Sequence, residues 1–240
     1  MSSFDKAPLR LSRIFGLASL ASLSALALTV TACGNGRTRP PNDPPGRLEG
    51  SIAATRGNAT GTKVTVEGYV SVQPGAFVSA LDDQGFAVQD DTAGVYVKVT
   101  EKQSFGLGAH VRVTGTLDEQ NQLRIVKAVP ADIATLDGTK QVTAKDVGTG
   151  AVNESVEGQL IRVSGSITKT FQDDSPYGYK LYINDGSGEV QVFVHVSAGL
   201  DKAKLQALAA GQRITAVGFA AQYDATYEVA PRQASDLTIP

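Results

Sequence analysis

One short strand with a glycine near its centre occurs twice in the chain. The first copy runs from Val64 to Val70 and the second from Ile161 to Ile167, and both alternate apolar and polar residues. This period of two is typical of a strand with one buried face. The glycine takes an inward position, which weakens a strand unless it must coil sharply or another backbone comes close. The first strand of a small closed barrel needs such a bend, because it belongs to both halves of the sheet.

The segments that follow each copy repeat as well. Residues 86–99 match residues 181–194 at a constant shift of 95, whereas the first strands are shifted by 97 and the fourth strands by 103. Shifts that change only between strands are what differences in loop length produce. A repeat of about 100 residues indicates duplicated domains rather than a solenoid of short repeats.

Each copy is predicted to contain five strands. In the first copy we expect them at about residues 62–72, 86–90, 95–99, 111–117 and 123–129, separated by polar turns. Inward-facing side chains should include Phe86, Val88, Val95 and Val97, with Tyr96 and Lys98 facing outward. No tryptophan and few aromatic residues are present, which fits valine- and alanine-filled barrel interiors.

The second copy has a longer connection between its third and fourth strands. Residues 201–210 favour a helix that Asp201 caps and Gly211 ends, with Leu205 and Leu208 on one face. Three strands, a helix and two more strands is the order of the OB-fold. The prediction is an all-β chain of two tandem five-stranded OB-folds. A pair of immunoglobulin-like sandwiches is the alternative, and the helix and the mid-strand glycines count against it.

The beginning of the chain has the pattern of a secretory signal peptide, which we assign to residues 1–32. Basic residues precede residues 14–30, which carry no charge, and the sequence then reads Val30-Thr31-Ala32-Cys33. This stretch resembles the lipobox of bacterial lipoproteins, although Val30 stands where leucine is commonest. The resemblance implies that Cys33 is acylated and becomes the mature N-terminus. An uncleaved signal anchor is the alternative, since the uncharged stretch approaches a minimal membrane span. Both interpretations put the remaining chain outside the cytoplasm.

Composition then divides the rest of the chain. Residues 33–60 form a tether and a lead-in, because the segment after Cys33 is too rich in proline and glycine to bury a core. We assign residues 61–136 to the first OB-fold and 157–240 to the second. The intervening residues 137–156 are interpreted as a linker, which predicts separable barrels.

The strand motifs resemble the tandem OB-fold domains of secreted and lipid-anchored bacterial proteins. Residues 64–68, 86–90, 108–115 and 158–165 carry this resemblance, and with residues 181–188 it spans 50–240. Related domains are often labelled nucleic-acid-binding and can precede extracellular nuclease domains, so the resemblance implies single-stranded nucleic acid as a ligand. No nuclease domain fits in this chain, and hydrolysis does not carry over.

No arrangement of side chains indicates catalysis or a cofactor. His110 and His195 occupy non-matching positions of the two copies and are interpreted as strand-edge residues. The only cysteine is assigned to lipidation, which leaves no thiol for a metal or a nucleophile. Asp90, Asp173 and Asp185 lie in segments without calcium-loop spacing, where aspartate is ordinary turn chemistry. The chain is therefore expected to be a non-enzymatic binding protein without a cofactor.

Ligand-binding residues are expected on the outer side of strands two and three, the usual binding face of an OB-fold. The candidates are Tyr96 and Lys98 in the first barrel, and Lys180, Tyr182, Phe193 and Tyr227 in the second. Tyr182 and Phe193 are expected side by side as a platform on which bases or sugar rings stack. The alternative is that these tyrosines are simply good strand residues.

Charge argues against a polyanionic ligand. The first barrel, residues 61–136, carries six basic and nine acidic residues, and the second, 157–240, carries seven and nine. Binding to nucleic acid draws its affinity from neutralised phosphates, so Arg162, Lys169 and Lys180 would have to supply the contacts. A glycan, a peptide or an envelope protein is an equally compatible partner. A structural or protein-interaction scaffold is the alternative function, and tyrosines scattered over opposite faces would favour it.

Overall fold

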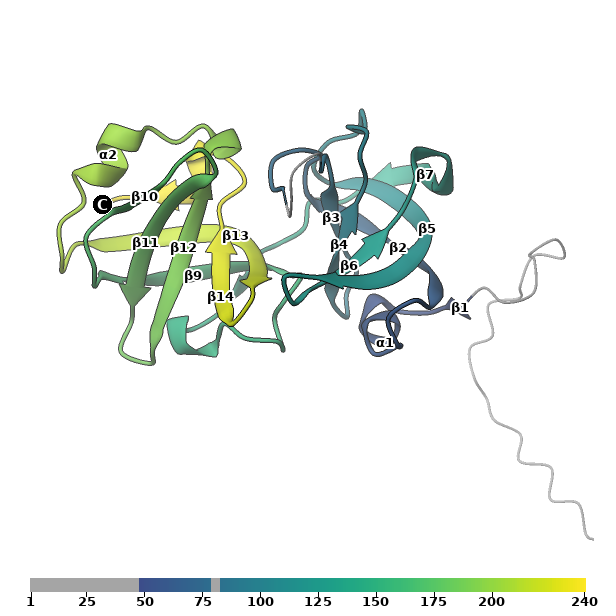
Figure 1. Cartoon of the computed structure of the whole chain (residues 1–240), viewed down its shortest axis with the longest axis horizontal. Helices are drawn as coiled ribbons and strands as arrows, with labels where there is room; N and C mark the ends of the chain where they lie inside the picture. The colour runs from purple at the N-terminus through teal and green to yellow at the C-terminus, as the bar shows by residue number, and fades with distance from the viewer. Residues whose placement is uncertain (1–47, 79–82) are drawn as a thin grey trace, which may run out of the picture. The chain divides into compact units, whose positions relative to one another are not determined.

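Two copies of a closed five-stranded barrel contain most of the strand residues (Figure 1). The structure, a computed structural model, describes residues 48–78 and 83–240. Cys33 and the predicted signal peptide lie outside the described residues, as does most of the tether. All the described residues belong to one unit of the chain, Asn42–Pro240.

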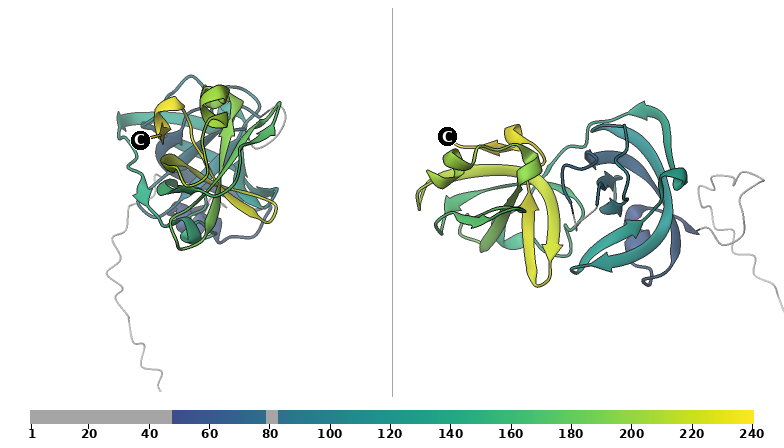
Figure 2. Two further views of the ribbon diagram at one scale, coloured as in Figure 1. Left: turned by 90° about the vertical axis from the view of Figure 1, so that its left-hand side faces the viewer. Right: turned by 45° about the horizontal axis from the view of Figure 1, so that its top comes forward.

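The first barrel closes in the strand order of an OB-fold. Its strands are β2 (Lys63–Val72), β3 (Phe86–Gln89), β4 (Gly94–Lys98), β5 (Ala109–Gln120) and β6 (Leu123–Lys127). β2 pairs with both β3 and β5, and β4 pairs in parallel with β6, so the sheet has no open edge along this path. The right-hand view in Figure 2 shows these strands curving round to meet. Four short elements flank them: β1 (Leu48–Glu49), α1 (Ile52–Arg56), η1 (Pro130–Asp132) and β7 (Ile133–Thr139).

The second barrel repeats this pairing. Its strands are β9 (Leu160–Ile167), β11 (Gly178–Asn184), β12 (Glu189–His195), β13 (Arg213–Tyr223) and β14 (Thr226–Ala230). β9 pairs with β11 and β13, and β12 pairs in parallel with β14. The other elements are β8 (Lys145–Asp146), η2 (Thr149–Ala151), β10 (Gln172–Asp174), η3 (Val196–Ala198), α2 (Lys202–Gln206), η4 (Ala234–Asp236) and β15 (Leu237–Thr238). The OB-fold prediction is thus confirmed, and the sandwich alternative is excluded because each sheet closes on itself.

The mid-strand glycines lie where two strands cross closely. A Cβ atom on Gly68 would lie 2.6 Å from the carbonyl oxygen of Gln89, and one on Gly165 would lie 2.9 Å from the backbone of β11. The fourth strands repeat the device, since a Cβ on Gly115 or Gly218 would lie 2.4 or 2.7 Å from the backbone of the fifth strand. Only glycine permits this approach, which is what the coiled first and fourth strands of a small barrel require.

The duplication extends beyond the strands. β1 pairs in parallel with β2, and β8 pairs in parallel with β9 at the equivalent register. In each copy a turn aspartate then caps the short helix before the first strand. Asp90 Oδ2 accepts a hydrogen bond from Ile52 N at 2.8 Å, and Asp185 Oδ2 accepts one from Thr149 N at 3.1 Å. The segment interpreted as a linker therefore contains β8 and η2, which pack on the second barrel as β1 and α1 do on the first.

The predicted helix of the second copy is present but short. Asp201 Oδ1 accepts a hydrogen bond from Ala203 N at 2.8 Å, so the predicted cap is confirmed. Leu205 and Leu208 are buried against the barrel interior, as expected from their shared face. α2 ends at Gln206 rather than at Gly211, because the chain must turn back into β13 and Gly211 adopts a positive φ of 85° there.

A third apolar cluster joins the two barrels. It is formed by outward-facing side chains of both: Val72, Ala76, Phe77, Ala87, Tyr96, Leu123 and Ile125 of the first, and Phe219, Ala221 and Ala230 of the second. The ring centroid of Phe219 lies 5.1 Å from that of Phe77 and 5.9 Å from that of Tyr96. Separating the barrels would expose this cluster to water, so the contact speaks against the prediction that they are separable.

Polar contacts surround the shared cluster. Arg232 Nη1 donates to the carbonyl of Ser71 at 2.9 Å, and Leu160 N donates to Gln89 Oε1 at 2.8 Å. The backbones of Gly94 and Gly158 meet so closely that a Cβ on Gly94 would lie 1.9 Å from the carbonyl oxygen of Gly158. The contact between the barrels therefore excludes side chains at its tightest point.

Replacing Gly68 with alanine should destabilise the protein by roughly 1–3 kcal/mol, because the new methyl group overlaps the Gln89 carbonyl and forces β2 away from β3. Gly106→Ala is the matched control, since Gly106 is exposed and no atom lies within 4 Å of its added Cβ. The measurement is the free energy of unfolding in urea. Equal stabilities of the two variants would contradict the close strand crossing.

Candidate binding face of the second barrel

The usual ligand face of the first barrel is covered. Its centre is Tyr96 on β4, which is 0% exposed in the cluster shared with the second barrel. The Tyr96 hydroxyl donates to Asp83 Oδ2 and to the carbonyl of Phe77, both at 2.9 Å. Tyr96 does face out of its own barrel, as predicted, but the expectation that it is open to a ligand is wrong. The reason is that the second barrel, rather than solvent, lies against this face.

Lys98 is the other site residue predicted in the first barrel. It is half-buried at the end of β4 and donates a hydrogen bond to Gln120 Oε1 at the end of β5. Gln89, which neighbours Tyr96 on the same face, bonds to the second barrel through Leu160 N. The structure therefore does not assemble Tyr96 and Lys98 into an open surface.

The corresponding face of the second barrel is built by β11 and β12. Antiparallel pairing places Lys180 opposite Phe193 and Tyr182 opposite Gln191, all four on the outer side of the sheet. Lys180 Nζ lies 5.9 Å from the centroid of the Phe193 ring. Both Lys180 and Tyr182 are half-exposed. β11 therefore presents the accessible part of this face.

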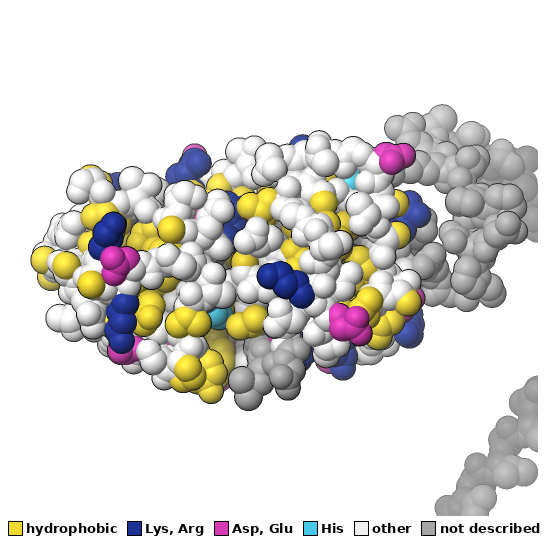
Figure 3. Space-filling model, turned by 90° about the horizontal axis from the view of Figure 1, so that it is seen from above, with side chains coloured by type: hydrophobic (Ala, Val, Ile, Leu, Met, Phe, Trp, Pro, Cys, Tyr) yellow, Lys and Arg dark blue, Asp and Glu magenta, His cyan; other side chains and the backbone are white. Residues whose placement is uncertain are grey.

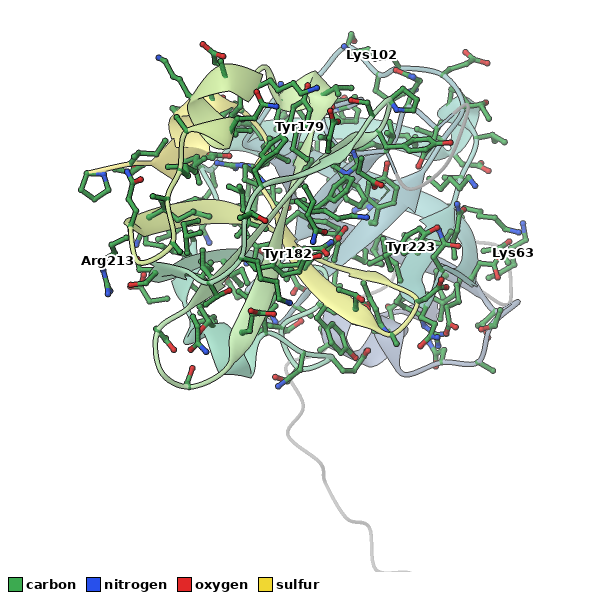
Figure 4. The ribbon with its side chains drawn as sticks, turned by 60° about the vertical axis from the view of Figure 1, so that its left-hand side comes forward. Lys63, Lys102, Tyr179, Tyr182, Arg213 and Tyr223 are labelled. Atoms are coloured by element: carbon green, nitrogen blue, oxygen red, sulfur yellow. The ribbon has the colours of Figure 1, made fainter. Side chains whose placement is uncertain are left out.

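Tyr182 is the aromatic residue at the centre of the face. Its hydroxyl donates to Gln172 Oε1 of β10 at 3.2 Å, which fixes the ring orientation. Lys169 Nζ lies 4.1 Å from the ring centroid, within the range of a cation–π contact. Figure 4 shows Tyr182 together with Tyr179 on β11, and Tyr223 at the end of the neighbouring β13–β14 hairpin.

The other predicted aromatic residues do not join Tyr182 on an open surface. Phe193 is only 7% exposed, and its ring centroid lies 4.8 Å from that of His195. Tyr179 and Tyr227 pack against the interior of the barrel instead, and the Tyr227 hydroxyl lies 3.4 Å from Glu154 Oε2. The platform expected from Tyr182 and Phe193 together is thus not available to a ligand. The scatter over two sides of the sheet is the pattern expected of strand tyrosines that serve packing.

Two exposed tyrosines border the face. Tyr177, in the loop between the first two strands, is 56% exposed, and Tyr223, beside the turn between the last two, is 58% exposed. These are the two loops that flank the ligand in OB-folds. Neither residue is among the candidates chosen from the sequence, which include Phe193 and Tyr227 instead. Tyr177 lies in a turn and Tyr223 is the last residue of β13, so both stay exposed where a strand ends or has not begun.

The cations of this face are paired with carboxylates. Lys180 Nζ lies 3.1 Å from Asp174 Oδ2, Lys169 pairs with Glu189, and Arg162 Nη1 lies 3.0 Å from Asp146 Oδ1. The hydrogen bond from Lys169 holds the pKa of Glu189 below its usual value. The three residues that a nucleic-acid ligand would need therefore already have anionic partners. Figure 3 shows the same intermixing of basic and acidic side chains on another face of the molecule.

A fourth such pair lies beside the turn of the β10–β11 hairpin. Lys202 donates a hydrogen bond to Asp173, which lowers the pKa of that carboxyl to about 2, with Ser175 contributing further hydrogen bonds. Asp173, like Asp90 and Asp185, also accepts hydrogen bonds from the backbone and hydroxyl of its own turn. The interpretation of these aspartates as turn residues is confirmed.

Two titratable groups are buried beneath the face. Burial raises the pKa of Glu228 to about 7, and Gln191 Nε2 donates to this carboxyl at 2.7 Å. Burial lowers the pKa of His195 to about 4, and its ring lies between Phe77 and Phe193, with centroids 4.8 Å from each. His195 is thus neutral at neutral pH and belongs to the contact between the barrels.

The described residues offer neither a metal site nor a membrane span. In residues 48–78 and 83–240, no group of three or more histidine, cysteine, aspartate or glutamate side chains is arranged to hold a metal ion. Within the same ranges no helix has the length and hydropathy needed to cross a bilayer.

Comparison with known proteins gives limited similarity. No protein-family model and no curated protein matches the chain. The p204 HINb domain is similar with a TM-score of 0.36, 11% identity and coverage of 71% of this chain and 93% of that one. For a murine DNA-binding protein bound to double-stranded DNA the TM-score is 0.34 and the identity 10%, with coverage of 68% of this chain and 90% of that one. For the single-stranded DNA-binding protein of Thermus aquaticus the TM-score is 0.26 and the identity 15%, with coverage of 76% of this chain and 94% of that one. At these scores the similarity carries no functional argument, and the fold assignment rests on the strand pairing.

Glu228 makes stability depend on pH. Because its pKa is raised in the folded state, its contribution is fully present below about pH 4.5 and is lost as the pH rises through about 7. At ~1.4 kcal/mol per pKa unit, the loss amounts to roughly 3 kcal/mol. Glu228→Gln should not suffer this loss. The free energy of unfolding of this variant, relative to that of the wild type, should therefore increase from pH 5 to pH 8. The exposed Glu101→Gln is the matched control and should follow the wild type. A Glu228→Gln curve parallel to the wild-type curve would show that the carboxyl is solvated.

Proposed function

We propose that this chain is a lipid-anchored, extracytoplasmic, non-enzymatic protein that binds an oligosaccharide on the outer face of β11 and β12. The observation that carries the proposal is the half-exposed Tyr182, bordered by the exposed Tyr177 and Tyr223 on a face whose cations are already paired. OB-folds bind oligosaccharides as well as oligonucleotides on this face.

The chemistry of the face suits sugar rings. Their apolar C–H faces pack on tyrosine rings, and their hydroxyl groups exchange hydrogen bonds with side chains such as Gln172 and Asp174. Such a ligand does not require the ion pairs to break, because it brings no charge that competes for Lys169 or Lys180. A polyanion would need those lysines, and their release from the carboxylates offsets part of the gain.

Single-stranded nucleic acid is the second candidate. The position of Lys169 Nζ, 4.1 Å from the Tyr182 ring centroid, favours it, since a lysine beside an aromatic ring can contact the phosphate of a stacked base. This ligand would bind with a measurable salt dependence, whereas a neutral oligosaccharide would not.

A binding panel separates the two candidates. We expect an uncharged oligosaccharide of the cell envelope to bind with little change between low and high salt, and Tyr182→Ala to weaken binding about tenfold, or ~1.4 kcal/mol. Val129→Ala is the matched control, because Val129 is exposed on the first barrel and outside this face. Isothermal calorimetry is the measurement.

The outcomes of the panel are distinct. Salt-sensitive oligonucleotide binding that is lost in Tyr182→Ala would contradict the oligosaccharide and establish the second candidate. Binding of neither ligand class at low salt would contradict both, and would favour the scaffold function that the scattered Tyr179 and Tyr227 suggest.

The membrane anchor is proposed from the sequence alone. Cys33→Ala should abolish labelling of the chain by a fatty-acid analogue and release it from the membrane fraction, because no other cysteine is present for acylation. A variant that stays in the membrane without label would support the uncleaved signal anchor instead. Labelling that survives the substitution would refute the lipoprotein assignment.

A further inference from the structure

Three outward side chains form a row across the second barrel. Tyr182 of β11 is in register with Gln191 of β12, and Gln191 is in register with Glu228 of β14. Because Tyr227 and Val229 pack into the barrel core, alternation puts Glu228 on the outer side of β14. Gln191 Nε2 donates to Glu228 Oε2 at 2.7 Å, which joins the last two members of the row. The row therefore extends the candidate binding face from β11 to β14.

This row keeps two oxygen atoms without a partner. Gln191 and Glu228 are only 8% and 6% exposed. The Oε1 atom of each makes no hydrogen bond within residues 48–78 and 83–240. Neither atom is fully buried, in contrast to three other unpartnered atoms of the described ranges, Ser71 Oγ, Glu157 Oε2 and His195 Nε2. Both oxygen atoms therefore reach the surface in the row that begins with Tyr182.

Glu228 is the carboxyl of this face that has no cation of its own. Lys169 pairs with Glu189, and Lys180 pairs with Asp174. The charged groups that face Glu228 are Lys180 of β11 and Asp174 of β10, whose charges offset each other. In the part of the chain that the structure describes Glu228 forms no ion pair, and burial raises its pKa to about 7. An ionised Glu228 would therefore leave the face one positive charge short.

We propose that Glu228 and Gln191 bind a protonated amino group carried by the oligosaccharide that packs on Tyr182. An ammonium group has three N–H donors and a positive charge, so it satisfies both free oxygen atoms and supplies the cation that Glu228 lacks. An aromatic ring such as that of Tyr182 also favours a neighbouring cation. The inference rests on the proposed oligosaccharide function and adds the class of ligand, a sugar chain with at least one free amino group.

A sugar hydroxyl group is the competing occupant. It also donates to the two oxygen atoms, but it carries no charge, so Glu228 can stay protonated in that complex. A bound ammonium group instead requires an ionised Glu228, and binding below the pKa of this carboxyl then releases a proton. The apparent affinity for an amine should therefore rise about tenfold from pH 5 to pH 6 and level off above about pH 7.

Two sugars with the same backbone separate these occupants. The probes are a trimer of glucosamine and the same trimer fully N-acetylated, measured by calorimetry with the full chain in a nonionic detergent. At pH 6 the free amino groups should strengthen binding at least tenfold, and this gain should be about tenfold smaller at pH 5. Glu228→Gln should abolish the gain, whereas Glu101→Gln, on an exposed residue of the first barrel, should retain it.

A second measurement requires no sugar. Propylammonium chloride is added to the full chain labelled at the glutamate carboxyl carbons, and the carboxyl resonance that is missing from Glu228→Gln reports the ionisation of Glu228. A bound ammonium group stabilises the carboxylate, so it should lower the pKa of Glu228. Potassium chloride at the same concentration is the control for salt screening and should leave that pKa higher.

The proposal is overturned if propylammonium and potassium have the same effect on the pKa of Glu228, or if both trimers bind with the same affinity at pH 6. Equal affinities that are lost in Tyr182→Ala would leave the oligosaccharide function intact and identify a hydroxyl group as the occupant. If neither trimer binds and propylammonium still lowers the pKa, the oligosaccharide function is refuted and the ammonium site is retained.

Discussion

The packing of Phe219 against Phe77 and Tyr96 joins the two barrels and determines which outer sheet faces remain accessible. These rings belong to different barrels and come together because the outer faces of both sheets are apolar at this place. Burying them makes one unit of two duplicated domains. It also covers the outer face of β3 and β4 in the first barrel, which is the face that usually holds the ligand in an OB-fold. The corresponding face of the second barrel, on β11 and β12, is left half-exposed.

Much of the fold was predictable from the sequence. The repeated strand with its central glycine specified a closed barrel, because a glycine is tolerated there only if two backbones cross closely. The sequence offset between the two copies changes only between strands, which predicted the positions of the loops. Asp201 predicted the start of α2. The short elements β1, β8, β10 and β15 were not predicted, since two or three residues have no periodicity to detect.

The candidate site was less predictable. Alternation along β4 correctly assigned Tyr96 to the outside of its barrel, but an outward position is exposed only if nothing packs on it. Ala87, Tyr96 and Ile125 are all outward and all apolar or aromatic, a signal that this sheet is buried on both faces. In the second barrel the same alternation placed Tyr182 correctly, and its neighbour Phe193 is buried beside His195. Pairing of the lysines with carboxylates depends on side-chain geometry across β10, β11 and β12, which strand alternation does not encode.

The two copies have diverged in complementary ways. In the first, β7 pairs along β5, and the second barrel packs on the outer face of β3 and β4. The second leaves the corresponding face around Tyr182 half-exposed.

The most direct test of the shared cluster is calorimetric unfolding of the wild type and of Phe219→Ala, with hydrogen exchange to report each barrel separately. The account predicts a single cooperative transition for the wild type, with equal calorimetric and van't Hoff enthalpies. In Phe219→Ala both barrels should lose stability, by about 3–5 kcal/mol in total. Two independent transitions in the wild type, or a loss confined to the second barrel, would contradict the claim that the barrels form one unit.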